Sequence, residues 1–167
     1  MNELRPGEEV RVGDVTVHVV RELSTAANAG VYRVATEDGP AYLWRGADED
    51  WREAIAHLEA QADGIDRDIL AVDSEAQPAR ALVSSRFEEV EPFEDGWWRD
   101  LDTSDALGGL EDLMEEVAQL HDHGLELRGI SRDEIVYDPV TLEMEIAGFS
   151  GLRTVGRIDE KVVWRDA

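Results

Sequence analysis

Apolar and polar residues alternate over much of the first half of the chain, and this pattern predicts β-strands. The predicted strands lie in 10–23, 31–35, 41–45 and twice within 68–90. Turn-forming residues separate them at 24–30, at Glu37–Pro40 and at Glu75–Pro78. The segments on either side of Glu37–Pro40 are therefore a predicted hairpin.

Two later segments have apolar residues at helical spacing instead. Residues 48–64 begin with acidic residues and end at Gly64, as a helix often does. The apolar residues on its one face are Trp51, Ile55, Leu58 and Ala62. Residues 110–124 form a second, strongly amphipathic predicted helix. Its apolar residues are Leu110, Leu113, Met114, Val117 and Leu120.

The remaining segments are shorter. Residues 91–109 read as a loop with some helix, and two short strands are predicted near 135–137 and 142–147. The stretch LHDHGLELRGISRDEIVYD, residues 120–138, joins a helix end to a turn and a strand. We find no internal repeat.

The order of these elements and the residues at 113–153 resemble the protein kinase-like superfamily. Leu120-His121 and Gly124 match the family's Leu-His-x-x-Gly at the end of this helix. The catalytic His-Arg-Asp then falls on Leu127-Arg128-Gly129, and the metal-binding asparagine falls on Glu134. The metal-binding Asp-Phe-Gly falls on Gly148-Phe149-Ser150.

The resemblance implies an α+β fold. We expect a kinase-like N-lobe, a twisted antiparallel sheet of about five strands with one helix, followed by an amphipathic helix and a β-hairpin. The remainder of the family's helical lobe is expected to be missing. In this interpretation 1–167 is a single domain, with 1–90 N-lobe-like and 91–167 a truncated C-lobe.

The resemblance also suggests nucleotide-binding residues. The glycine-rich phosphate loop falls on Ser24–Gly30, and the conserved strand lysine falls on Arg45. The glutamate that pairs with this lysine corresponds to Glu53 or Glu59, and Glu59 is preferred because it follows Ile55 by one helical turn. Arg45 and Glu59 are therefore the predicted cofactor-binding residues, with at most weak ATP binding.

The chemical groups of a kinase are lacking at the matched positions. Phosphoryl transfer needs an aspartate near the substrate hydroxyl, and an asparagine and an aspartate on magnesium. Gly129 and Gly148 have no side chain for these tasks, and Glu134 alone is a poor magnesium site. We predict no catalytic residue, no metal ligand and no enzyme activity. The chain is then a pseudokinase-like binding or regulatory module.

Two alternatives remain open at this stage. The first is a nucleotide-using transferase with a reorganised kinase-like site. The second is an unrelated small α+β domain in which the spacing is a coincidence. Nucleotide binding with a divalent ion would favour the transferase, because a binding module has no need of either.

Composition narrows the classes of partner. Asp and Glu number 39 against 16 Lys and Arg, giving a formal net charge of −23, which disfavours binding to nucleic-acid phosphates. Lys161 is the only lysine, so this acidic composition resembles that of halophilic proteins, although an acidic protein of a GC-rich bacterium would look similar. There is no cysteine and no long apolar run, so we expect a cytoplasmic protein without a membrane span.

The partner is therefore predicted to be a protein. In a complete kinase the helix matching 110–122 packs against helices that this chain lacks, so part of its apolar face is expected to stay uncovered. The predicted interface is this helix, through Leu113, Met114, Val117 and Leu120, or the tail 154–167. The partner is another protein or a second copy of the chain.

The excess of negative charge leads to a first testable prediction. Like charges on one folded chain repel one another, and dissolved salt screens this repulsion. We expect the melting temperature to rise from low to molar salt, measured by thermal unfolding across a salt series. A melting temperature that stays flat or falls would contradict the halophilic interpretation.

Overall fold

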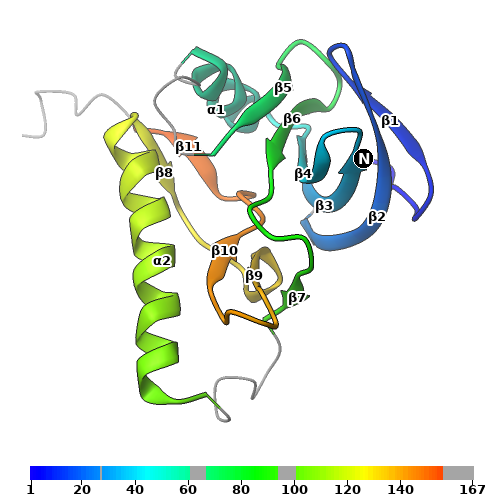
Figure 1. Ribbon diagram of the computed structural model, residues 1–167. Helices are drawn as coiled ribbons and strands as arrows, with labels where there is room; N and C mark the ends of the chain where they lie inside the picture. The colour runs from blue at the N-terminus through cyan, green and yellow to red at the C-terminus, as the bar shows by residue number, and fades with distance from the viewer. Residues whose placement is uncertain (27, 61–66, 94–100, 156–167) are drawn as a thin grey trace, which may run out of the picture.

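The computed structural model describes residues 1–26, 28–60, 67–93 and 101–155. Within these residues a six-stranded antiparallel sheet is followed along the chain by a region with one long helix and several short strands (Figure 1). The strands of the large sheet are β1 (Glu9–Val12), β2 (Val15–Ala26), β3 (Ala29–Thr36), β4 (Gly39–Gly46), β5 (Ile69–Asp73) and β6 (Ala79–Ser84). Their order in the sheet is β1-β2-β3-β4-β6-β5.

The predicted strands are confirmed, with two corrections. The sheet has six strands rather than about five, because the segment 10–23 supplies two strands and not one. The predicted turn at 24–30 is also too long. β2 and β3 continue into it, with Thr25 opposite Gly30 and Ala26 opposite Ala29. Small residues can pair in an antiparallel ladder, because the ladder uses only backbone groups.

The sheet curls until its two edge strands approach each other. β1 contacts β5, and an Arg80 guanidinium N–H donates to the Arg11 carbonyl at 2.8 Å. The face inside the curl is lined by valines, leucines, one tyrosine and one alanine, and nearly all of them are fully buried. These residues are Val10, Val12, Val17, Val19, Tyr32, Val34, Ala41, Leu43 and Leu82.

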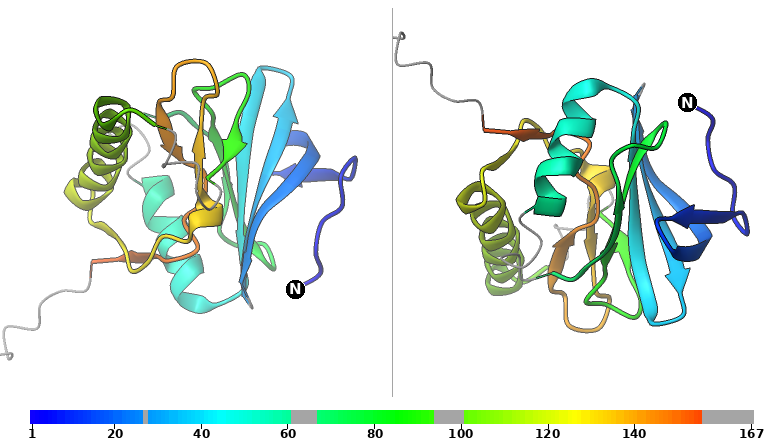
Figure 2. Two further views of the ribbon diagram at one scale, coloured as in Figure 1. Left: turned by 90° about the horizontal axis from the view of Figure 1, so that it is seen from below. Right: turned by 90° about the horizontal axis from the view of Figure 1, so that it is seen from above.

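Helix α1 (Glu49–Ala60) packs on the other face of the sheet, as Figure 2 shows. Its first turn is held by the Asp48 carboxylate, which accepts a hydrogen bond from the Trp51 N–H at 2.7 Å. Trp51 lies directly on β4 at Gly46, where any Cβ atom would overlap the indole ring. The close approach of helix and strand therefore requires glycine at position 46. The predicted helix residues 61–64 lie outside the described residues.

Helix α2 (Thr103–Asp122) is longer than the predicted segment 110–124, because it begins in the region expected to be mostly loop. Asp102 explains this start, since its carboxylate accepts from the Ser104 N–H at 2.8 Å. Leu120 is buried, and Leu113 and Val117 pack against the same core. Met114 is 63% exposed, in agreement with the expectation that part of this apolar face stays uncovered.

Short strands complete the structure beside α2. A three-stranded sheet contains β7 (Glu91–Pro92), β9 (Ile135–Tyr137) and β10 (Met144–Ile146), and a 3-10 helix (Arg132–Glu134) precedes β9. β8 (Leu125–Leu127) pairs with β11 (Leu152–Thr154). The hairpin β9–β10 was predicted, whereas β7, β8 and β11 were not. These three strands are only two or three residues long, which is too short for a repeating pattern of apolar and polar residues to identify them.

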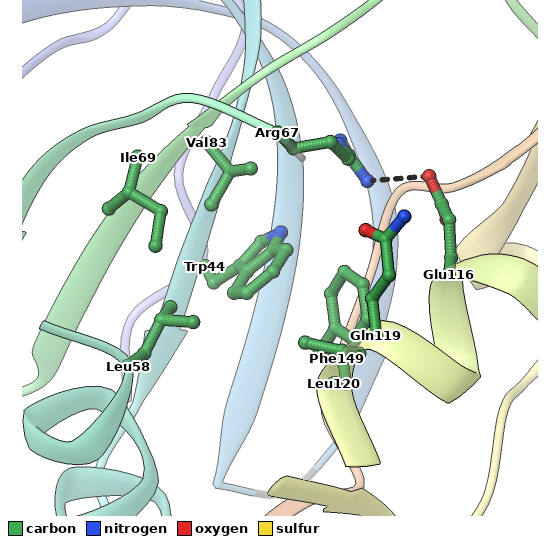
Figure 3. Close-up of a pocket in the computed structure, with 9 residues that line it drawn as sticks. All are labelled: Trp44, Leu58, Arg67, Ile69, Val83, Glu116, Gln119, Leu120 and Phe149. Atoms are coloured by element: carbon green, nitrogen blue, oxygen red, sulfur yellow. Dashed lines mark hydrogen bonds and ion pairs between the residues drawn. The ribbon is translucent and has the colours of Figure 1, made fainter. Parts of the chain in front are cut away.

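A buried ionic cluster of Arg67, Glu116 and Glu145 joins these parts, and Arg86, which is 48% exposed, pairs with both carboxylates at its edge. The Arg67 guanidinium lies 3.4 Å from Glu116 on α2 and 3.2 Å from Glu145 on β10. It also donates to the carbonyls of Ile146 (2.6 Å) and Ser84 (2.9 Å), so it ties the large sheet to α2 and the hairpin. Figure 3 shows the Arg67–Glu116 pair. Burial raises the pKa of Glu116 and outweighs the attraction of Arg67.

Removing the central arginine should destabilise the fold. In Arg67→Met two buried carboxylates lose a partner, which typically costs about 3–5 kcal/mol of unfolding free energy. Denaturant unfolding in molar salt measures this cost. The control Arg153→Met removes an arginine that is 23% exposed and should cost about 1 kcal/mol or less. Equal losses in the two variants would contradict a central role for the ionic cluster.

Candidate functional site

The candidate site is the space between the large sheet and the hairpin β9–β10, where the resemblance predicts a nucleotide. Trp44 on β4 reaches across this space to the segment after β10. Its indole N–H donates to the Ala147 carbonyl at 2.9 Å, and its ring lies 4.0 Å from the ring of Phe149. The two segments are therefore in direct side-chain contact.

The residues around Trp44 fill the rest of this space. Tyr42, two residues earlier on the same strand, donates its hydroxyl to Glu145 at 2.8 Å. Burial raises the pKa of Tyr42, with the Glu145 charge as a second cause, so the hydroxyl keeps its proton and can donate. Tyr42, Val31 and Val136 are each 0% exposed. An open cleft would leave these side chains accessible to water.

A small cavity remains next to Trp44 and is shown in Figure 3. Its lining includes Leu58, Ile69, Val83 and Leu120, with Arg67 and Glu116 at one side. Its volume is about 20 Å³, which is enough for one water molecule. A nucleotide base does not fit into it.

Arg45 lies on the opposite face of β4 from the predicted site. Successive strand residues point to opposite faces, and Trp44 is the one that faces the hairpin. The Arg45 guanidinium lies 5.9 Å from the centre of the Tyr32 ring and donates to the Asn2 carbonyl at 3.2 Å. Burial lowers its pKa. Arg45 therefore faces away from the space next to Trp44, as the alternation of Tyr42 and Trp44 could have shown, and its role in nucleotide binding stays a prediction.

Glu59 is also not directed into the site. It is exposed on α1, as is the other candidate, Glu53. The inward positions of this helix are taken by Trp51, Ala54, Ile55 and Leu58. Glu59 follows Leu58 directly, so it is turned about 100° away from that buried position. The structure does not bring Arg45 and Glu59 together, and nucleotide binding by either residue stays untested.

Glu134, at the position of the family's metal-binding asparagine, is fully buried. Its two carboxylate oxygens accept backbone N–H groups of Ser131 (2.9 Å) and Ser150 (2.8 Å). With Ser131 it forms a capping box for the 3-10 helix. Glu134 therefore joins the loop before β9 to the loop after β10. Each carboxylate oxygen of Glu134 takes part in this structural contact.

The two glycines at the remaining kinase positions differ in their surroundings. A Cβ atom at Gly148 would lie 2.6 Å from Glu134 Cγ and 2.8 Å from Val31 Cγ2. The place of the family's metal-binding aspartate is thus filled by the side chain of Glu134. Gly129 is exposed, and a Cβ atom there would meet nothing within 4 Å.

An open hollow lies in front of these loops, beside Gly129 and Ser150. Two arginines line it, and both have acidic partners. Arg128 lies 2.6 Å from Glu126, and Arg153 lies 3.5 Å from Asp50. Among the described residues no group of three or more His, Asp or Glu side chains could hold a metal ion.

Comparisons with known proteins support the fold. Solved structures similar to this chain include a structure of vaccinia related kinase 3 (TM-score 0.56, 11% identity, 91% of this chain and 53% of that chain). A crystal structure of the BubR1 kinase domain is similar as well (TM-score 0.54, 14% identity, 93% of this chain and 52% of that chain). No family model matches the sequence, and no curated protein matches it.

These similarities show a protein kinase-like fold. The chain spans about half the length of the kinase structures that it matches. The α+β architecture expected from the sequence is confirmed, and the alternative of an unrelated α+β domain is set aside. In the described part of the chain no helix is both long and apolar enough to cross a membrane. The division into two lobes and the pseudokinase interpretation stay predictions.

The contrast between the two glycines gives a matched pair of variants. Gly148→Ala forces Glu134 or Val31 to move and should cost about 1–3 kcal/mol of unfolding free energy. Gly129→Ala should change it by about 0.5 kcal/mol or less, because the added methyl group enters open space. Both glycines have ordinary backbone angles, so the comparison isolates packing. A destabilised Gly129→Ala beside an unaffected Gly148→Ala would contradict the packing described for Glu134.

Proposed function

We propose that this protein is a non-catalytic, pseudokinase-like binding module that acts through contacts with another protein. The observation that carries the proposal is the packing of Trp44 against Phe149 and Ala147. In the kinase-like fold this space holds the nucleotide, and here aromatic and aliphatic side chains of the chain itself occupy it. Kinase-like similarity supports the fold, and the geometry of the site supports the loss of chemistry.

The loops around the site support the same proposal. Both carboxylate oxygens of Glu134 accept backbone N–H groups, which hold this side chain between two loops of the chain itself. Gly148 leaves no room for an aspartate while Glu134 is in place. The changes at 134 and 148 therefore complement each other sterically. They form one consistent arrangement that replaces metal binding by packing.

Electrostatics favours a non-catalytic role as well. Phosphoryl transfer develops negative charge on the transferred group, and enzymes neutralise it with magnesium ions, lysines and arginines. The arginines beside the open hollow, Arg128 and Arg153, already have carboxylate partners. The chain also carries a formal net charge of −23, which opposes the approach of a triphosphate.

Incubation with labelled ATP and magnesium or manganese in molar salt tests the proposal. We expect no label on the protein or on generic protein substrates, and no heat of ATP binding in calorimetry. The variants Arg128→Ala and Arg45→Ala accompany the native chain. Arg128 lines the open hollow, whereas Arg45 lies on the far face of β4 and serves as the control.

Label that is incorporated by the native chain and by Arg45→Ala, but not by Arg128→Ala, would overturn the proposal. It would favour the transferase alternative, with its site in the open hollow. ATP binding without transfer of the label would contradict the argument that side chains fill the cleft. It would leave the proposed absence of catalysis unchallenged.

A further inference from the structure

Helix α2 presents a row of exposed apolar side chains to solvent. Leu107 is 60% exposed, Leu110 51% and Met114 63%. Their spacing of three and four residues places them on one face of the helix. In Figures 1 and 2, α2 lies at the margin of the molecule, with α1 and the hairpin β9–β10 between it and the large sheet. We call these three residues the α2 stripe.

The α2 stripe is not the row predicted from the sequence. That row contained Leu113, Val117 and Leu120, which contact the core. Met114 belongs to both rows, and Leu110 was among the apolar residues of the predicted helix. The exposed row begins one helical turn earlier, in the part of α2 that was expected to be loop. Leu113 and Val117 lie next to it, so the apolar surface continues from the stripe to the core without interruption.

The surroundings of the α2 stripe are strongly acidic. No lysine or arginine occurs between Asp102 and Gly124. The exposed carboxylates on the helix are Asp105, Glu111, Glu115 and Asp122. A hollow on a different face of α2, toward the turn that joins β9 to β10, is lined by Asp105, Glu111 and Glu143 and adds to the acidic character of this half of the helix.

We propose that the α2 stripe binds a partner segment whose apolar side chains are flanked by lysine or arginine. The inference rests on the proposed function as a binding module and names its surface and the chemistry of its partner. The three large side chains span eight helical residues, a rise of about 10 Å, which matches about two turns of an amphipathic helix. Basic residues beside that helix pair with Glu111 and Glu115, which are exposed and directly follow Leu110 and Met114 in the sequence.

The charges make other occupants less suitable. A second copy of this chain would bring its own Glu111 and Glu115 to the same interface, and like charges at an interface oppose association. An anionic lipid surface is repelled for the same reason. A cationic, apolar segment satisfies both features of the surface together.

Synthetic helical peptides test the inference with the native chain. The first peptide has leucines at helical spacing flanked by arginines. The second keeps the leucines and replaces arginine by glutamate, and the third keeps the arginines and replaces leucine by serine. Fluorescence anisotropy at low and molar salt measures binding of each. We expect only the first to bind well, and its affinity to fall with salt.

Two variants locate the binding surface. Leu110→Ser with Met114→Ser should weaken the first peptide about tenfold or more without altering the charge. Val140→Ser is the control, because Val140 is 86% exposed in the turn between β9 and β10 and lies outside the stripe. All these side chains are exposed, so the melting temperature should stay close to that of the native chain.

Several outcomes would overturn the inference. One is that the first peptide does not bind detectably. Another is that the third peptide, with serine in place of leucine, binds as well as the first, which would mean that charge alone drives binding. Unchanged affinity in the Leu110→Ser, Met114→Ser variant places the surface elsewhere. Self-association, or binding to anionic vesicles, that this variant abolishes assigns the stripe to a different occupant. None of these results bears on ATP use, so the failure of this inference and of the proposed function can be told apart.

Discussion

The buried ionic cluster is the constraint on which the other features of the structure depend. Arg67 and Glu145 are almost completely buried, and charges in such a place are tolerated only with partners and full hydrogen bonding. The partners come from four separate parts of the chain: the end of β6, the segment after it, α2 and β10. Moving any of these parts would leave a buried charge unpaired. The cluster therefore fixes the distance between the large sheet and the hairpin.

That fixed distance makes the filled cleft possible. Tyr42 belongs to both features, since its hydroxyl donates to Glu145 and its ring lies in the same core as Trp44. In a nucleotide-binding cleft the two sides must stay far enough apart to admit a base. Here Trp44 donates to Ala147 across the gap, so the two sides are held by a direct hydrogen bond. Side chains of the chain itself therefore fill the gap between the two sides.

The sequence predicted the fold better than the site. Alternation and helical spacing located the long strands and both helices, because their burial patterns repeat over many residues. Arg45 was matched to the family's lysine because both residues are charged, and charge alone does not tell which face of a strand a residue occupies. Its neighbour Trp44, which is apolar and larger, in fact occupies the inward position. The role of Glu134 and the cluster around Arg67 depend on contacts between residues far apart in the chain, and no local pattern reports such contacts.

The distribution of charge connects the interior with the surface. Arg33 and Arg45 are about 5% exposed, and their hydrogen bonds go to backbone carbonyls of Phe87 and Asn2. Among the described residues Arg67 is the third buried arginine, and three glutamates, Glu116, Glu134 and Glu145, are buried as well. The buried charges therefore balance, the exterior keeps the full negative excess of the composition, and α2 contributes no lysine or arginine to offset it. A surface of this kind discriminates by repulsion as well as attraction, because anionic partners are rejected wherever they approach. An apolar row on such a surface is selective for cationic partners, since only they gain from both burial and charge.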